Sequence, residues 1–301
     1  MKTNRNPKPT IAGIGEILWD LFPDGKRLGG APTNFACHCH QLGAISYPVS
    51  CIGGDQLGQK TREQLEQLGI DAGFLQENSA LETGRVVVSL NQQKKLTYQI
   101  IENVAWDHLL FTPDLKPLAH SLDAACFGIL SQRSTTTRET IRKFLGEMPE
   151  GSLKILDVNL RKPYFSKELI EESLQLATIL KLSDEELPVL ADFFDLKGEV
   201  VEQLSSLRER FDLDLVAYTR GPDGSVLLDR DDYNECPGTP VEVVDSVGAG
   251  DAFTAALCTG LLQQWPLYEV NAFAGRVAAF VCANYGATPI LPSFISEVAV
   301  D

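Results

Sequence analysis

Positive charge is scarce in this sequence. Of 301 residues, 26 are Lys or Arg and 41 are Asp or Glu, so the formal net charge is −15 and the pI is about 4.7. Such an acidic chain argues against a polyanionic partner, either nucleic acid or an anionic membrane surface. No apolar run approaches the roughly 18 residues that a membrane-spanning helix needs. Residues 1–10 lack the apolar core of a signal peptide, which predicts a cytoplasmic protein.

The cysteines do not have the pattern of a disulfide framework. Seven cysteines, an odd number, are scattered from Cys37 to Cys282, which favours reduced thiols. The four-residue cluster at 37–40 alternates Cys and His, but residues two apart on a helix face different directions, so no zinc site is expected there. The composition is otherwise that of a globular protein, long enough for one large α/β domain or two smaller ones.

The most informative stretch runs from Val244 to Thr254 and contains the tetrapeptide GAGD at 248–251. Residues 240–244 alternate like the end of a strand, and apolar residues from 253 to 261 recur at helical spacing. Gly248, Ala249 and Gly250 therefore open a helix, where unpaired N–H groups and the helix dipole favour an anion. An acid there, Asp251, would repel that anion unless it takes a proton from a hydroxyl that attacks a bound phosphoryl group. Alternatively, Asp251 only supports the helix start.

Residues 10–22 form a second informative run. The pair Gly13-x-Gly15 resembles part of a dinucleotide-binding motif, but the third glycine is missing and a strand pattern continues to Phe22 instead of a helix. An oxidoreductase with a dinucleotide site is therefore not predicted. Asp20 interrupts the apolar run, either as an edge residue facing water or as an acceptor for sugar hydroxyls.

Two further segments belong near this run. Gly29 and Gly30 make a tight turn before a helix that is predicted to end near Leu42-Gly43, and Asn34 on that helix can both donate to and accept from a polyol. Residues 84–90 and 95–101 are β-rich and flank a turn, as in a hairpin. With the strands before Gly30, this hairpin could form a small separate sheet.

From residue 123 onward the pattern alternates between strand and helix. Strands are predicted at 124–129, 154–158, 179–182, 215–219 and 225–228, and helices at 136–145, 167–178, 185–194 and 199–211. This alternation predicts a mostly parallel sheet covered on both faces, with ligands bound beyond the carboxyl ends of its strands.

Polar residues follow several of these strands. Each could be a helix cap or a solvated loop, but their succession at one sheet edge, together with the GAGD segment, indicates a binding site. They are Gln132 and Arg133; Asp157, Asn159 and Arg161; Lys181, Ser183 and Glu186; and Thr219 and Gly221.

The motifs GGAPTNFA (29–36), GGDQLG (53–58), DVNLR (157–161), KLSDEE (181–186) and DSVGAGDAF (245–253) resemble, in order and spacing, the ribokinase-like (PfkB) sugar kinases. The resemblance covers essentially the whole chain. GGAPTNFA, AWD (105–107), FGILSQRS (127–134) and DVNLR are similar to bacterial fructokinases. The family implies one α/β kinase domain over residues 1–301, a three-layer sandwich with a mostly parallel central sheet. It also implies a small β-sheet lid, from segments of about 14–29 and 82–104, through which some relatives dimerise; the run Val86–Val88 would serve such a dimer.

The resemblance also implies roles for the matching residues. Asp251 would be the catalytic base, and Gly248, Ala249 and Gly250 the anion hole. The sugar would contact Asp20, Gly30, Asn34, Arg133, Asn159 and Arg161. ATP would lie along Lys181, Ser183, Thr219, Gly221 and Gly224, and Glu186 would order Mg²⁺ through water.

Two positions depart from the family pattern. Ser183 replaces the Asn of the common Asn-x-x-Glu motif, and Gly275 replaces an Asn that could reach the adenine, which predicts a less selective nucleotide site. Asp245 and Gly286 match positions that hold a monovalent cation in some relatives, but Val247 offers no side-chain oxygen, so potassium activation is not expected.

The sequence thus predicts an ATP- and Mg²⁺-dependent kinase of a sugar primary hydroxyl, with fructose as the first choice. The rivals within the family are 2-keto-3-deoxygluconate kinase, for which Arg133 and Arg161 could bind a carboxylate, and ribokinase. In a different class, a non-catalytic nucleotide or sugar sensor could share this fold. The intact Asp251 argues against a sensor, which needs no base.

Overall fold

The computed structural model describes residues 8–23, 25–90 and 96–296. Its main sheet has nine strands. Seven neighbouring strands pair in parallel, namely β11, β10, β9, β8, β1, β4 and β5. Beyond β11, the strands β12 and β13 form an antiparallel edge. In spatial order the strands are β13 (Tyr233–Cys236), β12 (Ser225–Leu228), β11 (Leu215–Thr219), β10 (Ile179–Ser183), β9 (Leu153–Asp157), β8 (Ala124–Gly128), β1 (Thr10–Ile14), β4 (Ile45–Gly53) and β5 (Leu75–Asn78).

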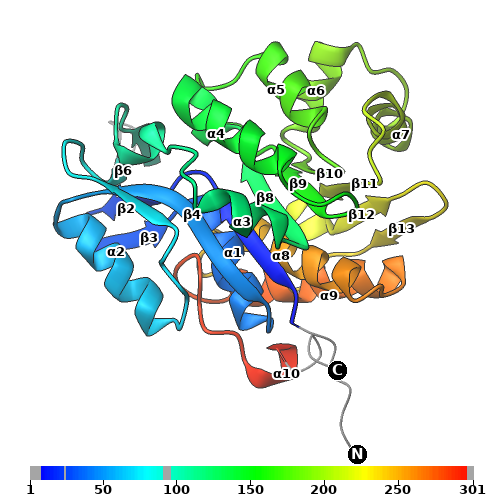
Figure 1. Cartoon of the computed structure of the whole chain (residues 1–301). Helices are drawn as coiled ribbons and strands as arrows, with labels where there is room; N and C mark the ends of the chain where they lie inside the picture. Colours follow the sequence, from blue (N-terminus) through cyan, green and yellow to red (C-terminus); the bar gives the residue numbers. More distant parts are fainter. Residues whose placement is uncertain (1–7, 24, 91–95, 297–301) are drawn as a thin grey trace, which may run out of the picture.

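Helices cover both faces of this sheet (Figure 1). One face packs against α3 (Leu115–His120), α4 (Thr135–Gly146), α5 (Lys167–Leu174), α6 (Leu187–Phe194) and α7 (Val200–Arg210). The other face packs against α1 (Ala31–Gln41), α8 (Ala249–Leu262) and α9 (Leu267–Cys282). Short helical turns are η1 (Ala105–His108), η2 (Leu130–Arg133), η3 (Gly221–Asp223) and α10 (Ser293–Ser296). This is the predicted ribokinase-like three-layer architecture.

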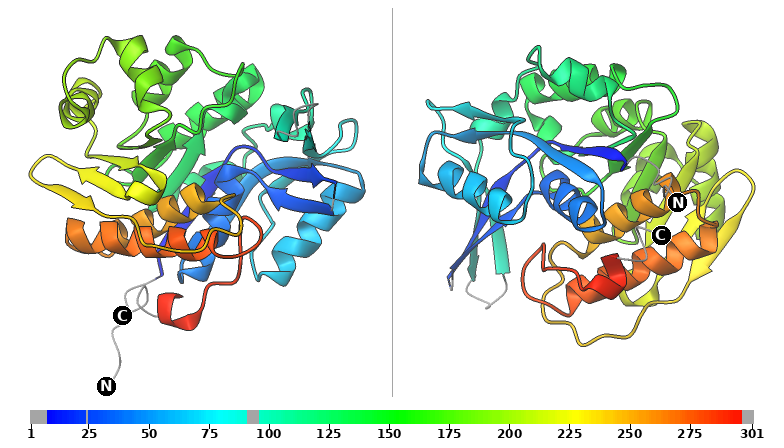
Figure 2. Two further views of the ribbon diagram at one scale, coloured as in Figure 1. Left: turned by 180° about the vertical axis from the view of Figure 1, so that it is seen from behind. Right: turned by 60° about the horizontal axis from the view of Figure 1, so that its bottom comes forward.

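A second, four-stranded sheet stands beside the main one (Figure 2). Its order is β3 (Gly25–Gly29), β2 (Leu18–Phe22), β6 (Gly84–Leu90) and β7 (Leu96–Ile100), with α2 (Gln56–Gln67) nearby. Trp19 anchors β2 to α2, because its indole N–H donates to the Thr61 hydroxyl over 2.9 Å. The predicted hairpin of β6 and β7 is confirmed; its turn at 91–95 lies outside the described residues.

The two faces of the main sheet follow from the alternation of side chains along each strand. In β10, Leu180 and Leu182 enter the core under α3–α7, whereas Ile179 enters the core under α8 and α9. Lys181 is on the same face as Ile179, and its register partner in β9 is Asp157. The period of two therefore places a buried charged pair on the face that carries α8.

Two sequence predictions were wrong in detail. Residues 10–22 form two strands in different sheets, β1 and β2, with a break at 15–17. Residues 240–244 form no strand: Val241, Val243 and Val244 are exposed, and the N–H groups of Val244 and Asp245 donate to the Cys282 carbonyl at the end of α9. An alternating pattern becomes a strand only where a neighbouring strand accepts its hydrogen bonds. The part of the chain that the structure describes contains no helix long and apolar enough to span a membrane.

Candidate active site

A cavity of about 670 Å³ lies between the small sheet and the carboxyl edge of the main sheet. Leu18, Phe22, Val86 and Tyr98 line it from the small sheet. The fold brings most of the predicted site residues to its walls. Those that line the cavity are Asp20, Gly30, Asn34, Asn159, Arg161, Lys181, Gly248, Gly250 and Asp251.

Asp251 projects into this cavity from the first turn of α8. Asn34, on α1, donates from its amide nitrogen to the Asp251 carboxylate over 2.8 Å. Burial and the charge of Asp157 raise the pKa of Asp251 to about 6, although the bond from Asn34 and the charge of Lys181 oppose this rise. A carboxylate with this pKa is ionised at neutral pH and is a stronger base than an ordinary Asp, as a proton acceptor requires.

The start of α8 is shaped by Gly248. This residue caps the helix with φ of 81°, and a Cβ at this position would lie 2.3 Å from the Ala287 carbonyl oxygen. That carbonyl is itself held by the buried ring of His38, at 2.9 Å from Nε2. Only glycine fits here. The bare helix start presents N–H groups and the positive end of the dipole to the cavity.

A buried ion pair lies beneath the GAGD segment. Lys181 Nζ is 3.0 Å from Asp157 Oδ1, and the Thr254 hydroxyl on α8 donates to Asp157 Oδ2 over 3.2 Å. A Cβ on Gly250 would lie 3.1 Å from Lys181 Nζ, so the ammonium sits directly against the helix start. Burial lowers the pKa of Lys181, but the charges of Asp157 and Glu186 outweigh burial and the pKa is raised. Lys181 is therefore a fixed positive charge.

The opposite wall of the cavity carries Gly30 and two further acids, Asp20 and Glu16. Gly30 is the N-cap of α1 with φ of 109°, and a Cβ there would lie 2.4 Å from the Glu16 carbonyl oxygen, so the backbone approaches the cavity unobstructed. Burial raises the pKa of Asp20 to about 6, against the nearby charges of Arg161 and Arg27.

Glu16 is a site residue that our sequence reasoning missed. It is 2% exposed, lines the cavity, and has one carboxylate oxygen, Oε2, that is buried without a hydrogen-bond partner. Burial, assisted by the charge of Asp251, raises the pKa of Glu16 to about 7. The available signal was an acid between two apolar strand segments, the same signal that identified Asp20.

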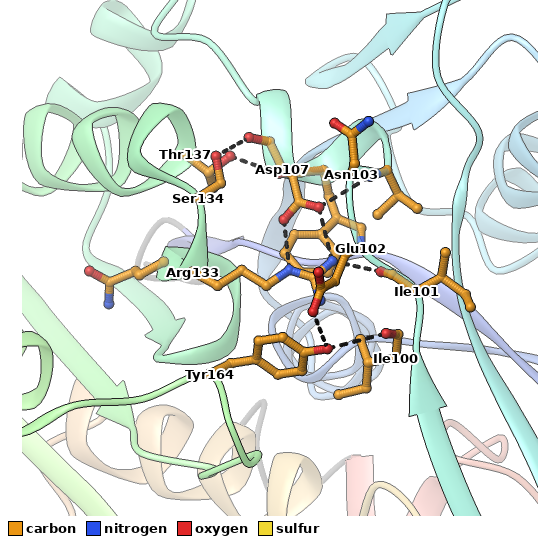
Figure 3. A network of polar contacts seen from close by, with 12 residues as sticks. Ile100, Ile101, Glu102, Asn103, Asp107, Arg133, Ser134, Thr137 and Tyr164 are labelled. Carbon is orange, nitrogen blue, oxygen red and sulfur yellow. Dashed lines mark hydrogen bonds and ion pairs between the residues drawn. The ribbon is translucent and has the colours of Figure 1, made fainter.

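Arg133, a predicted sugar contact, does not line this cavity. It belongs to a network of polar contacts between η2 and the chain that follows β7 (Figure 3). Its Nε and one terminal nitrogen donate to the two oxygens of Asp107 over 2.8 and 2.9 Å, and that terminal nitrogen also donates to the Ile101 carbonyl. The guanidinium stacks on Trp106 and Tyr164, with centroid distances of 4.0 and 4.9 Å. Arg133 thus fastens the chain leaving β7 to the main body.

Other predicted residues lie at the same sheet edge but outside the cavity. Ser183 ends β10 and Thr219 ends β11, while Gly221 and Gly224 flank η3. Ala249 is the first residue of α8.

Asn159, unlike these residues, lines the cavity. Its backbone φ is 39°, an unusual conformation for a residue other than glycine.

Glu186 spans two loops of this edge. One carboxylate oxygen accepts from the Leu160 N–H and the other from the Ser183 N–H, each over 2.8 Å. Among the described residues no three His, Cys, Asp or Glu side chains converge as a metal cage. Mg²⁺ does not require such a cage, because it usually binds one or two carboxylates and completes its shell with water and substrate phosphates.

Comparison with known proteins identifies the family to which this chain belongs. The model of the pfkB family carbohydrate kinases matches residues 24–293. The chain belongs to the pfkB family of carbohydrate kinases. It is therefore a phosphotransferase that uses a sugar hydroxyl as acceptor.

Individual relatives agree with this family. The kinase is 31% identical over 260 residues to a fructokinase of Klebsiella pneumoniae, covering 82% of this chain and 83% of the relative. It is 30% identical over 296 residues to an uncharacterized sugar kinase of Pyrococcus horikoshii, covering 92% of this chain and 91% of the relative. A crystal structure of that sugar kinase superposes with a TM-score of 0.79 over 93% of each chain. A fructokinase of Xylella fastidiosa with bound ATP shares the fold, with a TM-score of 0.85 over 98% of each chain at 21% identity.

Proposed function

We propose that this pfkB kinase transfers the γ-phosphoryl group of ATP to the primary C6 hydroxyl of fructose. The observation that carries the proposal is the placement of Asp251. It lies at the start of α8, is held by Asn34, and faces a cavity whose other wall carries Asp20 and Gly30. Fructokinases among the relatives at about 30% identity support fructose as the acceptor.

The proposed reaction uses each wall of the cavity. Asp20, Asn34 and the backbone at Gly30 hold sugar hydroxyls, with Asn159 and Arg161 at the rim. Asp251 accepts the proton of the C6 hydroxyl while the C6 oxygen of the sugar bonds to the γ-phosphorus of ATP. The bond from the γ-phosphorus to the bridging oxygen that leaves with ADP breaks. The N–H groups of Gly248 and Gly250, which line the cavity, stabilise the negative charge on the transferred group. Ala249 is the third candidate, and its N–H donates to the Ser246 carbonyl in this structure.

The nucleotide is proposed to lie along the carboxyl ends of β10 and β11. Lys181, Ser183, Thr219, Gly221 and Gly224 are the candidate contacts. Mg²⁺, bound with ATP, supplies positive charge to the phosphates. Glu186 is the candidate for ordering the waters of this ion.

The charges of the cavity favour a neutral sugar over a sugar acid. Four acids line it, Glu16, Asp20, Glu185 and Asp251, against the two cations Arg161 and Lys181. Lys181 is paired with Asp157 and Arg133 with Asp107, so neither is available to a substrate carboxylate without losing a buried partner. Among the cations that line the cavity this leaves Arg161 to bind a carboxylate, against four acids. This balance disfavours 2-keto-3-deoxygluconate, whereas ribose differs from fructose in size and not in charge.

A coupled assay of ADP release tests the proposal. Fructose, ribose, mannose and 2-keto-3-deoxygluconate are compared by kcat/KM with Mg²⁺-ATP. Fructose is expected to give the highest value. A higher value for 2-keto-3-deoxygluconate would overturn the fructose assignment and leave the kinase assignment standing, and binding of sugar and ATP without turnover would favour a sensor.

A further inference from the structure

Arg27 lies between two acidic groups that belong to different parts of the molecule. It is on β3 of the small sheet, directly across the ladder from Asp20 on β2. Its guanidinium nitrogen is 3.5 Å from Asp245 Oδ2, in the loop before α8. The charge of Arg27 lowers the pKa of Asp20 and the charge of Asp245 raises it, which places all three groups within electrostatic reach of one another.

Asp245 in turn holds the backbone next to the anion hole. Its Oδ1 accepts from the Val247 N–H and its Oδ2 from the Gly286 N–H, each over 3.1 Å. Val247 is adjacent to Gly248, the cap of α8, and Gly286 is adjacent to Ala287, whose carbonyl lies against Gly248. The Asp245 carboxylate therefore fixes both segments that shape the start of α8.

The geometry points to Arg27 as a positioning residue that couples the sugar wall of the cavity to the anion hole. This inference rests on the proposed sugar-binding role of Asp20. A sugar that neutralises or reorients the Asp20 carboxylate changes the field at Arg27, and the ion pair with Asp245 transmits this change to Val247 and Gly248. The guanidinium is braced for this role by stacking on Phe22, with 4.3 Å between Cζ and the ring centroid.

The fork of arginine is needed for this arrangement. A planar guanidinium can stack on Phe22 while its nitrogens face two carboxylates, whereas a lysine ammonium is a single point charge. The contact also joins the small sheet to the main body at the cavity, since Phe22 and Val247 both line it. Arg27 thus promotes phosphoryl transfer in sugar-bound enzyme without itself touching the phosphates.

The test compares Arg27→Gln with Arg85→Gln. Arg85 is a second arginine of the small sheet, its side chain is 32% exposed against 33% for Arg27, and it pairs with Glu82 away from the cavity. Arg27→Gln is expected to lower kcat with saturating sugar by about 10- to 100-fold, the loss typical of a misplaced catalytic group. The KM for ATP and the melting temperature should match those of Arg85→Gln, which should keep wild-type kcat.

Two further measurements separate positioning from folding. Millimolar guanidinium should restore part of the activity of Arg27→Ala and none in Arg85→Ala. Asp245→Asn removes the ion pair with Arg27 and also one acceptor of the Val247 and Gly286 N–H groups. It should therefore cause a smaller loss in the background of Arg27→Gln than in wild type, because the ion pair is already lost there. Equal kcat for Arg27→Gln and Arg85→Gln, or additive losses with Asp245→Asn, would overturn the inference. If the wild type phosphorylates no sugar, it is the proposed function that fails.

Discussion

Asp251 is the residue whose protonation controls the proposed reaction. Its pKa is raised to about 6, so the carboxylate form required of a base is lost as the pH falls through 6. We expect kcat/KM for the sugar to rise with pH through about 6 and then level off. The bond from Asn34 lowers this pKa, so Asn34→Ala should move the rise to higher pH. A pH–rate profile from 5 to 8 measures both effects.

Asp251→Asn is the control for this profile. The amide cannot accept the proton, so kcat should fall by about 10²–10⁴-fold, and kcat at saturating sugar should no longer rise with pH through 6. ATP should still bind, because the start of α8 is unchanged. Near wild-type activity in Asp251→Asn would place the base elsewhere and leave Asp251 as a support of the helix start.

Glu16 links the cavity to the stability of the fold. Its folded-state pKa of about 7 exceeds the ordinary value of 4.5, so folded protein holds a proton that unfolded protein releases between these values. The free energy of unfolding is therefore expected to decrease as the pH rises from 4.5 to 7. The decrease amounts to roughly 3 kcal/mol, since one unit in pKa is worth about 1.4 kcal/mol.

Glu16→Gln removes this titration. The free energy of unfolding is measured by urea unfolding at pH 5 and pH 8. It should fall less between these pH values in the variant than in wild type, and the difference should be up to roughly 3 kcal/mol. An equal loss in both proteins would show that Glu16 is ionised without cost and that its environment is wetter than the structure indicates.

At the scale of elements, the start of α8 depends on a glycine. Gly248→Ala places a Cβ against the Ala287 carbonyl and requires φ near 81°, a conformation that costs about 1–3 kcal/mol for a residue with a side chain. We expect a loss of stability of that order and a large fall in kcat. Thermal unfolding measures the loss of stability in Gly248→Ala, with Gly275→Ala as the control.

Gly275 is the matched control for stability. It lies in the middle of α9, and a Cβ there would meet no atom within 4 Å beyond its chain neighbours and the adjacent backbone of the helix. Gly275→Ala should therefore be neutral or stabilising by up to about 1 kcal/mol, the helix preference of alanine over glycine. If both variants were equally stable, close packing at Gly248 would not be what the site requires.

The same elements show what could be predicted from the sequence. Parallel strands buried on both faces appear as short apolar runs, so the predicted bounds of β8 to β11 agree with the structure to within one residue. The predicted bounds of α4, α6 and α7 agree to within two residues, whereas α5 ends at Leu174 and not at 178. The run 10–22 is apolar on both sides of its break, so the sequence pattern does not show that its two halves belong to different sheets. For 240–244, the decisive fact was the lack of a partner strand, which is a tertiary property.

The candidate site was predictable where the motif fixes the backbone and less so where charges pair over long distances. Local geometry requires glycine at 248 and 30, and Gly30, Gly248, Gly250 and Asp251 all line the cavity. The partner of Arg133 is Asp107, 26 residues away, and nothing local distinguishes an arginine that binds a ligand from one that fastens two segments. Glu16 lies in the break between β1 and β2, so its place in the cavity wall could not be predicted while residues 10–22 were expected to form one strand.

At the scale of the whole molecule, the small sheet is proposed to act as a lid. It supplies Asp20 and Tyr98 to the cavity while the base comes from the main body, so a bound sugar contacts both parts and favours their closed arrangement. Closure would also exclude water, which competes with the sugar for the phosphoryl group. Hydrogen exchange in β6 and β7 is expected to slow when sugar binds. Sugar-free hydrolysis of ATP should be much slower than sugar phosphorylation; unchanged exchange with equal rates would show that the sheet is no gate.

A homodimer through this sheet stays a proposal, with one correction. Val86 and Val88 are buried against their own sheet, 6% and 3% exposed, and Val86 lines the cavity. Alternation along β6 turns these two side chains inward, so they cannot form the exposed dimer face that the run of valines suggested.

The most direct test of the account is to locate the transferred phosphate. Wild-type enzyme is incubated with Mg²⁺-ATP and fructose or 6-deoxyfructose, and the products are identified by ³¹P and ¹H NMR. We predict fructose 6-phosphate from fructose, and from 6-deoxyfructose only the slow release of inorganic phosphate, because the oxygen that faces Asp251 is missing. Phosphate on another fructose oxygen, or phosphorylation of 6-deoxyfructose at a comparable rate, would contradict the proposal.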